Sequence, residues 1–161
     1  MDLLLKMPEL YEPLRRNRFI IRFPSDLGIQ EWWVASASRP SITIGSTEIP
    51  FLNTSSYVAG RYTWESITIT LRDPIGPSAS QAVMEWVRLH AESVTGRMGY
   101  AVGYKRDLII EMLDPTGTSV SMWILKQCQI TNAKFGDLDY SQDDIATVEL
   151  QIQPYYCILA Y

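Results

Sequence analysis

The single histidine of the chain, His90, is the side chain whose charge changes nearest neutral pH, so it is the first candidate for acid-base chemistry. It lies at spacings of three and four from Trp86, Val87 and Val94, which is typical of the apolar face of a helix. The sequence places no suitable nucleophile or metal site around it. We interpret His90 as a hydrogen-bonded residue at the edge of the core, and we expect no catalytic residues and no enzymatic activity.

Two further patterns imitate binding sites without completing them. Four aspartates near the carboxyl end could suggest a calcium loop: Asp137, Asp139, Asp143 and Asp144. The glycine and the terminal glutamate that such a loop needs are missing. Gly96, Gly99 and Gly103 punctuate another segment, but no lysine-serine pair follows them as in a phosphate-binding loop. We therefore expect no metal site and no cofactor-binding residues.

Cys128 and Cys157 are far apart in sequence, and their spacing matches no metal-ligand pattern. Both lie among apolar residues, where a free cysteine behaves as a small hydrophobe. The amino-terminal MDLLLKMPEL lacks the basic region and the apolar length of a secretory signal, and no stretch approaches the roughly 20 apolar residues that cross a bilayer. We expect buried free thiols in a soluble chain made in a reducing cytoplasm.

The composition indicates one globular domain that does not grip nucleic acid. The chain has 161 residues, of which 47% are hydrophobic, enough for one sizeable core. Its net charge of -4 and pI near 5.0 argue against the basic face that holds a phosphate backbone. The aromatic pairs Trp32-Trp33 and Tyr155-Tyr156 could stack on bases, but without a basic groove they favour core packing or a subunit contact. By elimination, the chain is predicted to be a structural or binding protein.

A strand followed by a helix organises the predicted core. Residues 66–72 alternate between apolar and polar side chains, as in a half-buried strand. A helix is predicted over residues 78–95, where Ser78 and Gln81 have the spacing of a capping box. Gly96 is expected to end this helix, because glycine readily adopts the left-handed conformation that closes one.

Six further segments have the alternation or the composition of strands: 18–23, 31–37, 41–49, 105–113, 118–131 and 145–152. Residues 50–60 are predicted to be a long connection, and residues 135–144 an acidic loop. The predicted fold class is mainly β (α+β), an antiparallel β-sandwich or partly open barrel of seven or eight strands with one packed α-helix. A single domain spans residues 1–161, with an amino-terminal arm or short helix over 1–16.

The order of several motifs resembles that of a known family. These motifs are Ile49-Pro50-Phe51, Asn53, Val58-Ala59-Gly60, Arg61, Thr63-Trp64, a helix carrying Trp86, and residues 126–152 with Gly136-Asp137-Leu138-Asp139-Tyr140. From Arg18 onward the chain is similar to the tail tube proteins of contractile-tailed bacteriophages. The resemblance implies a subunit that forms hexameric rings, in which neighbouring sheets join into a continuous inner β-barrel. Such closure would pair the exposed strand edges, which could otherwise pair with other chains and cause aggregation.

The resemblance also implies partners and a location. Rings would stack into a tube inside a contractile sheath, so the partners are further copies of the chain, the tail sheath protein, and the baseplate and tail terminator proteins. A tape measure protein would occupy the lumen, and DNA would pass through it into the host without specific binding. The protein would be made in the host cytoplasm and reside in the tail of the virion.

Candidate contact residues follow from the same resemblance. Residues 46–62 correspond to the loop that reaches the adjacent ring, with candidate stacking contacts at Phe51, Leu52, Asn53, Tyr57, Val58 and Arg61. Candidate lumen-facing residues are Ser66, Thr68, Thr70, Thr147, Glu149 and Gln151. The opposite face of the same strands should pack in the core through Ile67, Ile69, Leu71, Val148, Leu150 and Ile152. A neutral-to-acidic lining would let DNA slide, because it offers few fixed cations to phosphate.

Two kinds of alternative remain open at this point. A tube-initiating baseplate subunit, or the tube of a related contractile injection system such as type VI secretion, would share the fold. A monomeric β-sandwich binding module belongs to another class and would stay monomeric at every concentration.

Overall fold

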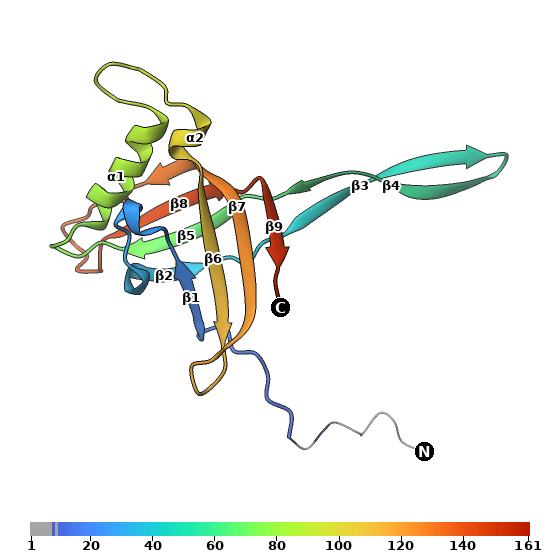
Figure 1. Cartoon of the computed structure of the whole chain (residues 1–161), viewed down its shortest axis with the longest axis horizontal. Helices are drawn as coiled ribbons and strands as arrows, with labels where there is room; N and C mark the ends of the chain where they lie inside the picture. Colours follow the sequence, from blue (N-terminus) through green and yellow to red (C-terminus); the bar gives the residue numbers. More distant parts are fainter. Residues whose placement is uncertain (1–7, 9) are drawn as a thin grey trace.

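The computed structural model describes residue 8 and residues 10–161 (Figure 1). Much of the predicted arm over 1–16 therefore lies outside the described residues, and residues 10–16 contain no helix. The strands are β1 (Phe19–Arg22), β2 (Val34–Ala37), β3 (Ile42–Phe51), β4 (Thr54–Trp64), β5 (Ile67–Arg72), β6 (Arg106–Leu113), β7 (Ser119–Lys134), β8 (Thr147–Gln153) and β9 (Tyr156–Leu159). The helices are α1 (Ala79–His90), the short α2 (Ala101–Tyr104), and the 3-10 turns η2 (Ser25–Leu27) and η3 (Glu31–Trp33).

Seven strands form one antiparallel sheet in the order β1-β6-β7-β8-β5-β2, with β9 also paired to β7. Strand β7 is 16 residues long and belongs to both halves of this sheet. Its first half pairs with β6 and β9, and its second half pairs with β8. The predicted mainly β fold with antiparallel strands and a packed helix is confirmed, and the sheet does not close into a barrel within one chain. The described residues form nine strands rather than seven or eight, since β4 and β9 lie outside the predicted strand segments.

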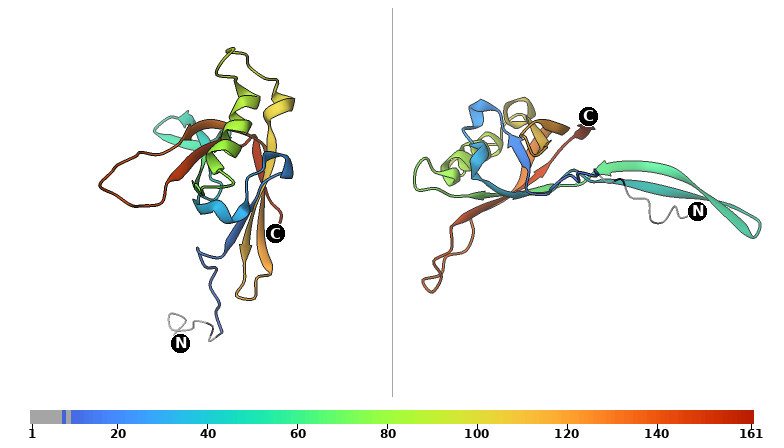
Figure 2. Two further views of the ribbon diagram at one scale, coloured as in Figure 1. Left: turned by 90° about the vertical axis from the view of Figure 1, so that its left-hand side faces the viewer. Right: turned by 90° about the horizontal axis from the view of Figure 1, so that it is seen from below.

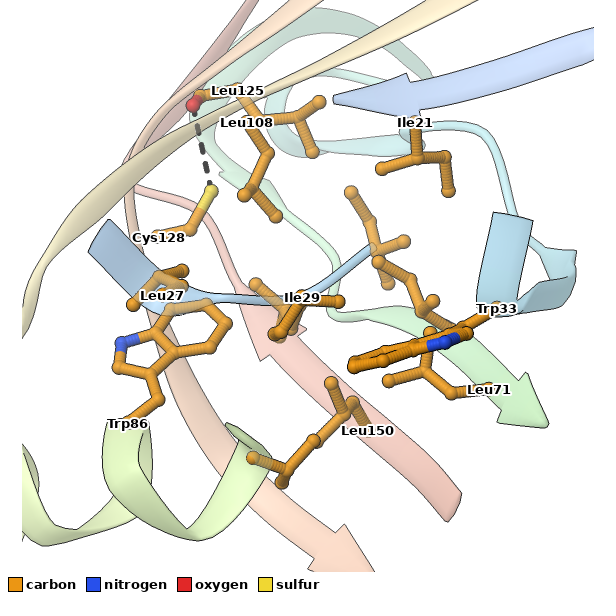
Figure 3. Close-up of a cluster of buried hydrophobic side chains, with 14 of the residues drawn as sticks. Ile21, Leu27, Ile29, Trp33, Leu71, Trp86, Leu108, Leu125, Cys128 and Leu150 are labelled. Carbon is orange, nitrogen blue, oxygen red and sulfur yellow. Dashed lines mark hydrogen bonds between the residues drawn. The ribbon is translucent and has the colours of Figure 1, made fainter. Parts of the chain in front are cut away.

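The two halves of the sheet enclose the core, together with α1 (Figure 3). The alternation predicted for β5 and β8 is confirmed, because their inward residues are fully buried: Ile67, Ile69, Leu71, Val148, Leu150 and Ile152. Helix α1 contributes Ala79, Val83 and Trp86 to the same cluster. Trp33 is also buried there, but Trp32 is largely exposed, because residues 31–33 form η3 and not the predicted strand.

Helix α1 begins where predicted and ends earlier. The Ser78 hydroxyl accepts a hydrogen bond from the Gln81 amide at 3.4 Å, and the Asp73 carboxylate accepts one from the Ala79 amide at 3.0 Å. The helix stops at His90 because the next residue is extended and bridges to Met98. The predicted end at Gly96 is therefore wrong: Gly96, with φ +71°, closes a separate turn.

The predicted long connection over residues 50–60 is also wrong, because these residues form the tip and the distal part of a β-hairpin. Strands β3 and β4 pair from Ile42 and Trp64 out to Phe51 and Thr54. Leu52 has a φ of +53° and occupies the turn, a conformation that bulky residues seldom adopt. The hairpin projects far from the rest of the chain in Figure 1 and in the right-hand view of Figure 2.

Candidate assembly surfaces

The β3–β4 hairpin leaves the main sheet at a kink between two paired segments. Strand β2 pairs with β5, and the last bond of that ladder joins the Ser38 amide to the Thr68 carbonyl at 3.1 Å. Pro40 cannot donate a backbone hydrogen bond and interrupts the ladder there. Pairing resumes with the Glu65 amide and the Ser41 carbonyl at 3.0 Å. Beyond the kink, β3 and β4 pair with each other and with no other described strand.

The distal half of the hairpin exposes apolar side chains on both faces. In its register, Val58 lies opposite Thr47 and Phe51 opposite Thr54, so Val58 and Phe51 share one face. Tyr57 lies opposite Glu48 and therefore points to the other face. Leu52, at the tip, is 89% exposed. Apolar residues on two faces of one ribbon require partners on two sides, because a single neighbour can cover only one face.

Gly45 and Gly60 lie at a bulge that divides this hairpin. The register shifts between Ile44 and Ser46, where β4 carries one extra residue. A Cβ atom added at Gly45 would lie 3.0 Å from the Arg61 carbonyl oxygen, so only glycine fits without a shift of backbone. Arg61 thus lies at the bulge, away from the tip that carries Phe51, Leu52 and Asn53.

The structure adds exposed apolar residues that the sequence reasoning did not select. Ile49 points to the same face as Phe51 and Val58, and Ile44 and Tyr62 lie opposite each other nearer the body. Ile49 would have been found by extending the alternation of residues 41–49 through Pro50. Proline at an exposed strand edge does not end a strand, and Pro50 lies opposite Ser55 within the hairpin.

The predicted lumen-facing residues largely share one face of the sheet. Thr68 pairs with Gln151, Thr70 with Glu149, and Arg72 with Thr147, all on the side opposite to the core. Ser66 lies just before β5, where its hydroxyl donates to the Gln153 side-chain oxygen at 2.8 Å. The structure therefore brings the set together along β5 and β8, as the alternation predicted.

The charge of this polar face differs from the neutral-to-acidic expectation. Lys134 on β7 lies opposite Glu149, and Arg72 ends β5 on the same face as Thr70. A bulge between Ile130 and Asn132 turns the end of β7 so that Lys134 faces this side. The face thus carries charges of both signs, and the expectation failed because it considered β5 and β8 without their neighbours.

His90 links α1 to β7 through both ring nitrogens. Its Nδ1 donates to the Trp86 carbonyl at 3.0 Å, and its Nε2 accepts from the Ile130 amide at 3.1 Å. Its ring stacks on that of Tyr104, with centroids 4.2 Å apart. Burial lowers the pKa of His90, the Trp86 carbonyl opposes that effect, and the charge of Arg106 lowers the pKa further. This geometry confirms His90 as a hydrogen-bonded residue at the edge of the core.

The free energy of unfolding should decrease at acid pH because His90 becomes protonated. The pKa of His90 in the folded chain lies below the ordinary 6.5, so as pH falls the unfolded chain binds this proton first. The contribution of neutral His90 to the free energy of unfolding is therefore complete above about pH 6.5 and is lost as pH falls through the pKa of the folded chain. Protonation also removes the acceptor for the Ile130 amide. Urea midpoints measured at pH 7 and pH 5 should fall further for the wild type than for His90→Gln, which cannot gain a proton. Equal losses in both proteins would contradict this assignment.

Asp139 of the acidic loop and the two cysteines also lie in contacts within the fold. The described residues contain no group of three or more histidine, cysteine, aspartate or glutamate side chains placed to hold a metal ion. Asp139 accepts hydrogen bonds from the Ser141 amide and hydroxyl, which lower the pKa of Asp139. Cys128 and Cys157 are free and buried, and burial raises the pKa of their thiols to about 12 and about 11. Among the described helices, none has the length and apolar character needed to span a membrane.

One protein family matches nearly the whole chain. The sequence profile described as T4-like virus tail tube protein gp19 matches residues 15–157, a range that includes the hairpin, the helices and the polar face. A search of curated protein sequences finds no significant match.

Solved structures with a similar fold come from contractile injection systems. The anti-feeding prophage tube terminating cap superimposes with a TM-score of 0.76 at 18% identity, covering 99% of this chain and 98% of that one. A chain of the PVC sheath-tube complex in the extended state gives 0.72 at 18% identity, with 93% of each chain covered. Hcp1 from Flavobacterium johnsoniae gives 0.50 at 10% identity, covering 89% and 94%. At these identities the similarity concerns the fold.

Proposed function

The chain belongs to the T4-like virus tail tube protein gp19 family, and from this premise we propose that its copies form hexameric rings that stack into a hollow tube. Membership in the family makes the chain a structural subunit of a tail tube. In the proposal, DNA passes through the lumen of the tube into the host, and the subunit has no catalytic role. The observation that carries it is the exposed β3–β4 hairpin.

The hairpin supports stacking because its apolar side chains are left exposed by the described part of the chain. Phe51, Leu52, Tyr57 and Val58 extend beyond the body on a two-stranded ribbon, and isolated hairpins are marginally stable in water. Burial between adjacent rings would remove this apolar surface from water and order the ribbon. In this proposal the hairpin contacts the next ring through Phe51, Leu52, Asn53, Tyr57 and Val58, with Arg61 at the bulge.

The polar face of β5 and β8 supports the role of a channel wall. Thr68, Thr70 and Gln151 offer hydroxyl and amide groups, which form weak, exchangeable contacts with phosphate. Glu149 lies opposite Lys134, so this cation has a neighbouring anion. Arg72 lies at the end of the face, where it also lines a groove beside β1 and β2. A lining of this kind would let a polyanion slide without strong counterion release.

The proposed partners follow from the family and from the named assemblies of similar fold. One similar chain is the cap that terminates a tube, another comes from a sheath-tube complex, and a third comes from a baseplate. By analogy, the tube would contact a contractile sheath around it, a baseplate at one end and a terminator at the other. A tape measure protein in the lumen, residence in the virion tail and synthesis in the host cytoplasm complete the proposal.

Electron microscopy of the purified protein tests the proposed function directly. Rings with six subunits, or hollow tubes built from them, are the expected result. A protein that stays monomeric at every concentration would refute the proposal and favour a monomeric binding module. A ring that caps tubes of another protein, present once per particle, would favour a tube-initiating or terminating subunit.

A positive charge added to the polar face should make the tube retain DNA. Thr70→Arg places a new guanidinium on each subunit of the proposed wall, where it can pair with phosphate. We expect tubes of this variant to retain short single-stranded DNA at low salt and to release it as salt rises, while wild-type tubes retain little. Val120→Arg, on β7 outside this face, serves as the control in a filter-binding measurement. Equal retention by both variants would exclude β5 from the channel wall.

A further inference from the structure

The connection between α1 and α2 carries an apolar patch that the residues described by the structure leave exposed. We define this connection patch as Val94, Met98, Tyr100 and Val102, of which Tyr100 is 87% and Val102 91% exposed. The segment is well ordered by its backbone: the Gly96 amide donates to the Glu92 carbonyl, and the Gly99 amide donates to the His90 carbonyl, both at 2.9 Å. Exposed apolar residues on a rigid support are typical of an interaction site.

The connection patch is held against the second half of β7. Trp86 Nε1 donates to the Tyr104 carbonyl at 2.8 Å and ties α2 to α1, while the Ile130 amide bonds to His90 Nε2 and ties α1 to β7. Gly99 makes this close packing possible, since an added Cβ atom would lie 2.0 Å from the Leu89 carbonyl oxygen. The patch therefore lies beyond the β7 end of the strand row β7-β8-β5-β2.

A groove of about 1070 Å³ lies at the other end of the same row. Its floor and walls come from the edge strands β1 and β2 and from η3, with Phe19, Phe23, Trp32 and Val34 among its apolar residues. We call it the edge groove. Binding cavities usually measure about 300–1,000 Å³, so the groove has room for several side chains.

The connection patch and the edge groove lie on opposite sides of the molecule. In Figure 1 the α1–α2 connection is at the top, β1 and β2 are in the lower half, and the hairpin extends to the right, across that direction. Stacking through the hairpin therefore leaves both surfaces free to meet copies beside the chain. A contact between two different surfaces of identical subunits is heterologous, and it closes into a ring when the rotation permits.

Charged side chains of both signs lie at the two surfaces, since Glu31 also lines the edge groove and the exposed Arg97 lies within the segment of the connection patch. Arg16 and Arg72 line the edge groove, and neither forms an ion pair with another described residue. Glu92 flanks the connection patch, where its carboxylate accepts a hydrogen bond from the Thr95 hydroxyl at 2.8 Å. In a contact between the two surfaces, Glu92 beside the patch would meet the basic side chains of Arg16 and Arg72 along the groove.

We propose that the connection patch of each subunit fills the edge groove of the next subunit around the ring. The inference rests on the proposed function and extends it, because it states which surfaces close the ring. The occupant of the groove is a second copy of this chain, with Tyr100 and Val102 as the inserted side chains. The same contact would cover the exposed Trp32 side chain.

Cysteine pairs test this contact in assembled rings. Val102→Cys and Gln30→Cys in one chain, treated with a short bismaleimide cross-linker, should produce a ladder of covalent oligomers that ends at the closed ring. Gln30 lines the groove, and the native thiols are buried. Each single variant alone should yield no oligomers, and an equal mixture of the two should yield dimers only.

The outcomes separate the inference from the proposed function. Rings that form without a ladder overturn the inference and leave the proposed function standing. Dimers from Val102→Cys alone indicate a symmetric contact and also overturn it. A wild-type chain that forms no rings overturns both.

A charge in the connection patch gives a second test that does not need cross-linking. Tyr100→Asp should weaken ring formation at least tenfold by sedimentation without changing the urea midpoint of the monomer. Tyr140→Asp is the matched control, because Tyr140 is fully exposed in the loop between β7 and β8. If Tyr100→Asp forms rings at the same protein concentration as the wild type, the proposal is contradicted.

Discussion

Val58→Asp should yield a folded chain whose rings no longer stack into tubes. Val58 is 48% exposed in the single chain and shares a hairpin face with Phe51, so aspartate there meets water and costs the monomer little. In the proposed stack the same carboxylate would be buried without a partner. Burying an uncompensated charge or polar group costs several kcal/mol, and a penalty of about 3 kcal/mol already weakens a contact roughly 100-fold.

Sedimentation and electron microscopy, with circular dichroism for the fold, check this result. Val120→Asp is the matched control: Val120 lies on β7, is 45% exposed and undergoes the same change in a strand. Tyr57→Asp tests the other face of the hairpin and should also block stacking, because both faces require partners. If Val58→Asp tubes form at the wild-type concentration, the hairpin is not the stacking element.

Trp86→Ala should cause the largest loss of stability among single substitutions in the helix. The Trp86 side chain is completely buried among residues of α1, the sheet and the segment before β2 (Figure 3). Truncating a buried tryptophan costs about 3–5 kcal/mol through lost burial and the cavity left behind. The Tyr104 carbonyl also loses its donor, which adds about 1 kcal/mol.

Urea unfolding followed by circular dichroism measures this loss. Trp86→Phe keeps an aromatic ring but removes the indole donor, so its loss should be clearly smaller than that of the alanine variant. The alanine variant should also impair ring formation, since α2 and the connection patch depend on the bond from Trp86. A loss below about 1 kcal/mol for Trp86→Ala would contradict the central position of this side chain.

Local patterns predicted the elements whose structure depends on neighbouring residues in sequence. The alternation of residues 66–72 and 145–152 predicted strands with one buried face, and the Ser78-Gln81 spacing predicted the start of α1. The predicted strands over 105–113 and 118–131 are joined as β6 and β7 by a turn at residues 114–117, with Gly117 at φ +89°. The order of motifs also predicted the family.

Non-local pairing decided most of the remaining features. The end of α1 depends on the bridge from Ala91 to Met98, so a glycine placed six residues beyond the true end misled the prediction. The alternation of residues 41–49 predicted most of β3, but β4 was missed because Pro50 and Gly60 interrupt the pattern, while the pairing with β3 compensates for them. No local signal shows which strand will lie opposite a given segment.

The features of the candidate assembly surfaces also divide into those that the sequence determined and those that the tertiary structure decided. The sequence alone determined which residues of β5 and β8 point away from the core, because side chains alternate along any strand. The tertiary structure decided that Lys134 and Arg72 join that face, since a bulge in β7 and the register with β8 set their direction. It also decided that the predicted stacking residues lie on a two-sided ribbon, and that the groove and the connection patch lie at opposite ends of one strand row. These features depend on contacts between distant segments, and alternation along one segment carries no information about them.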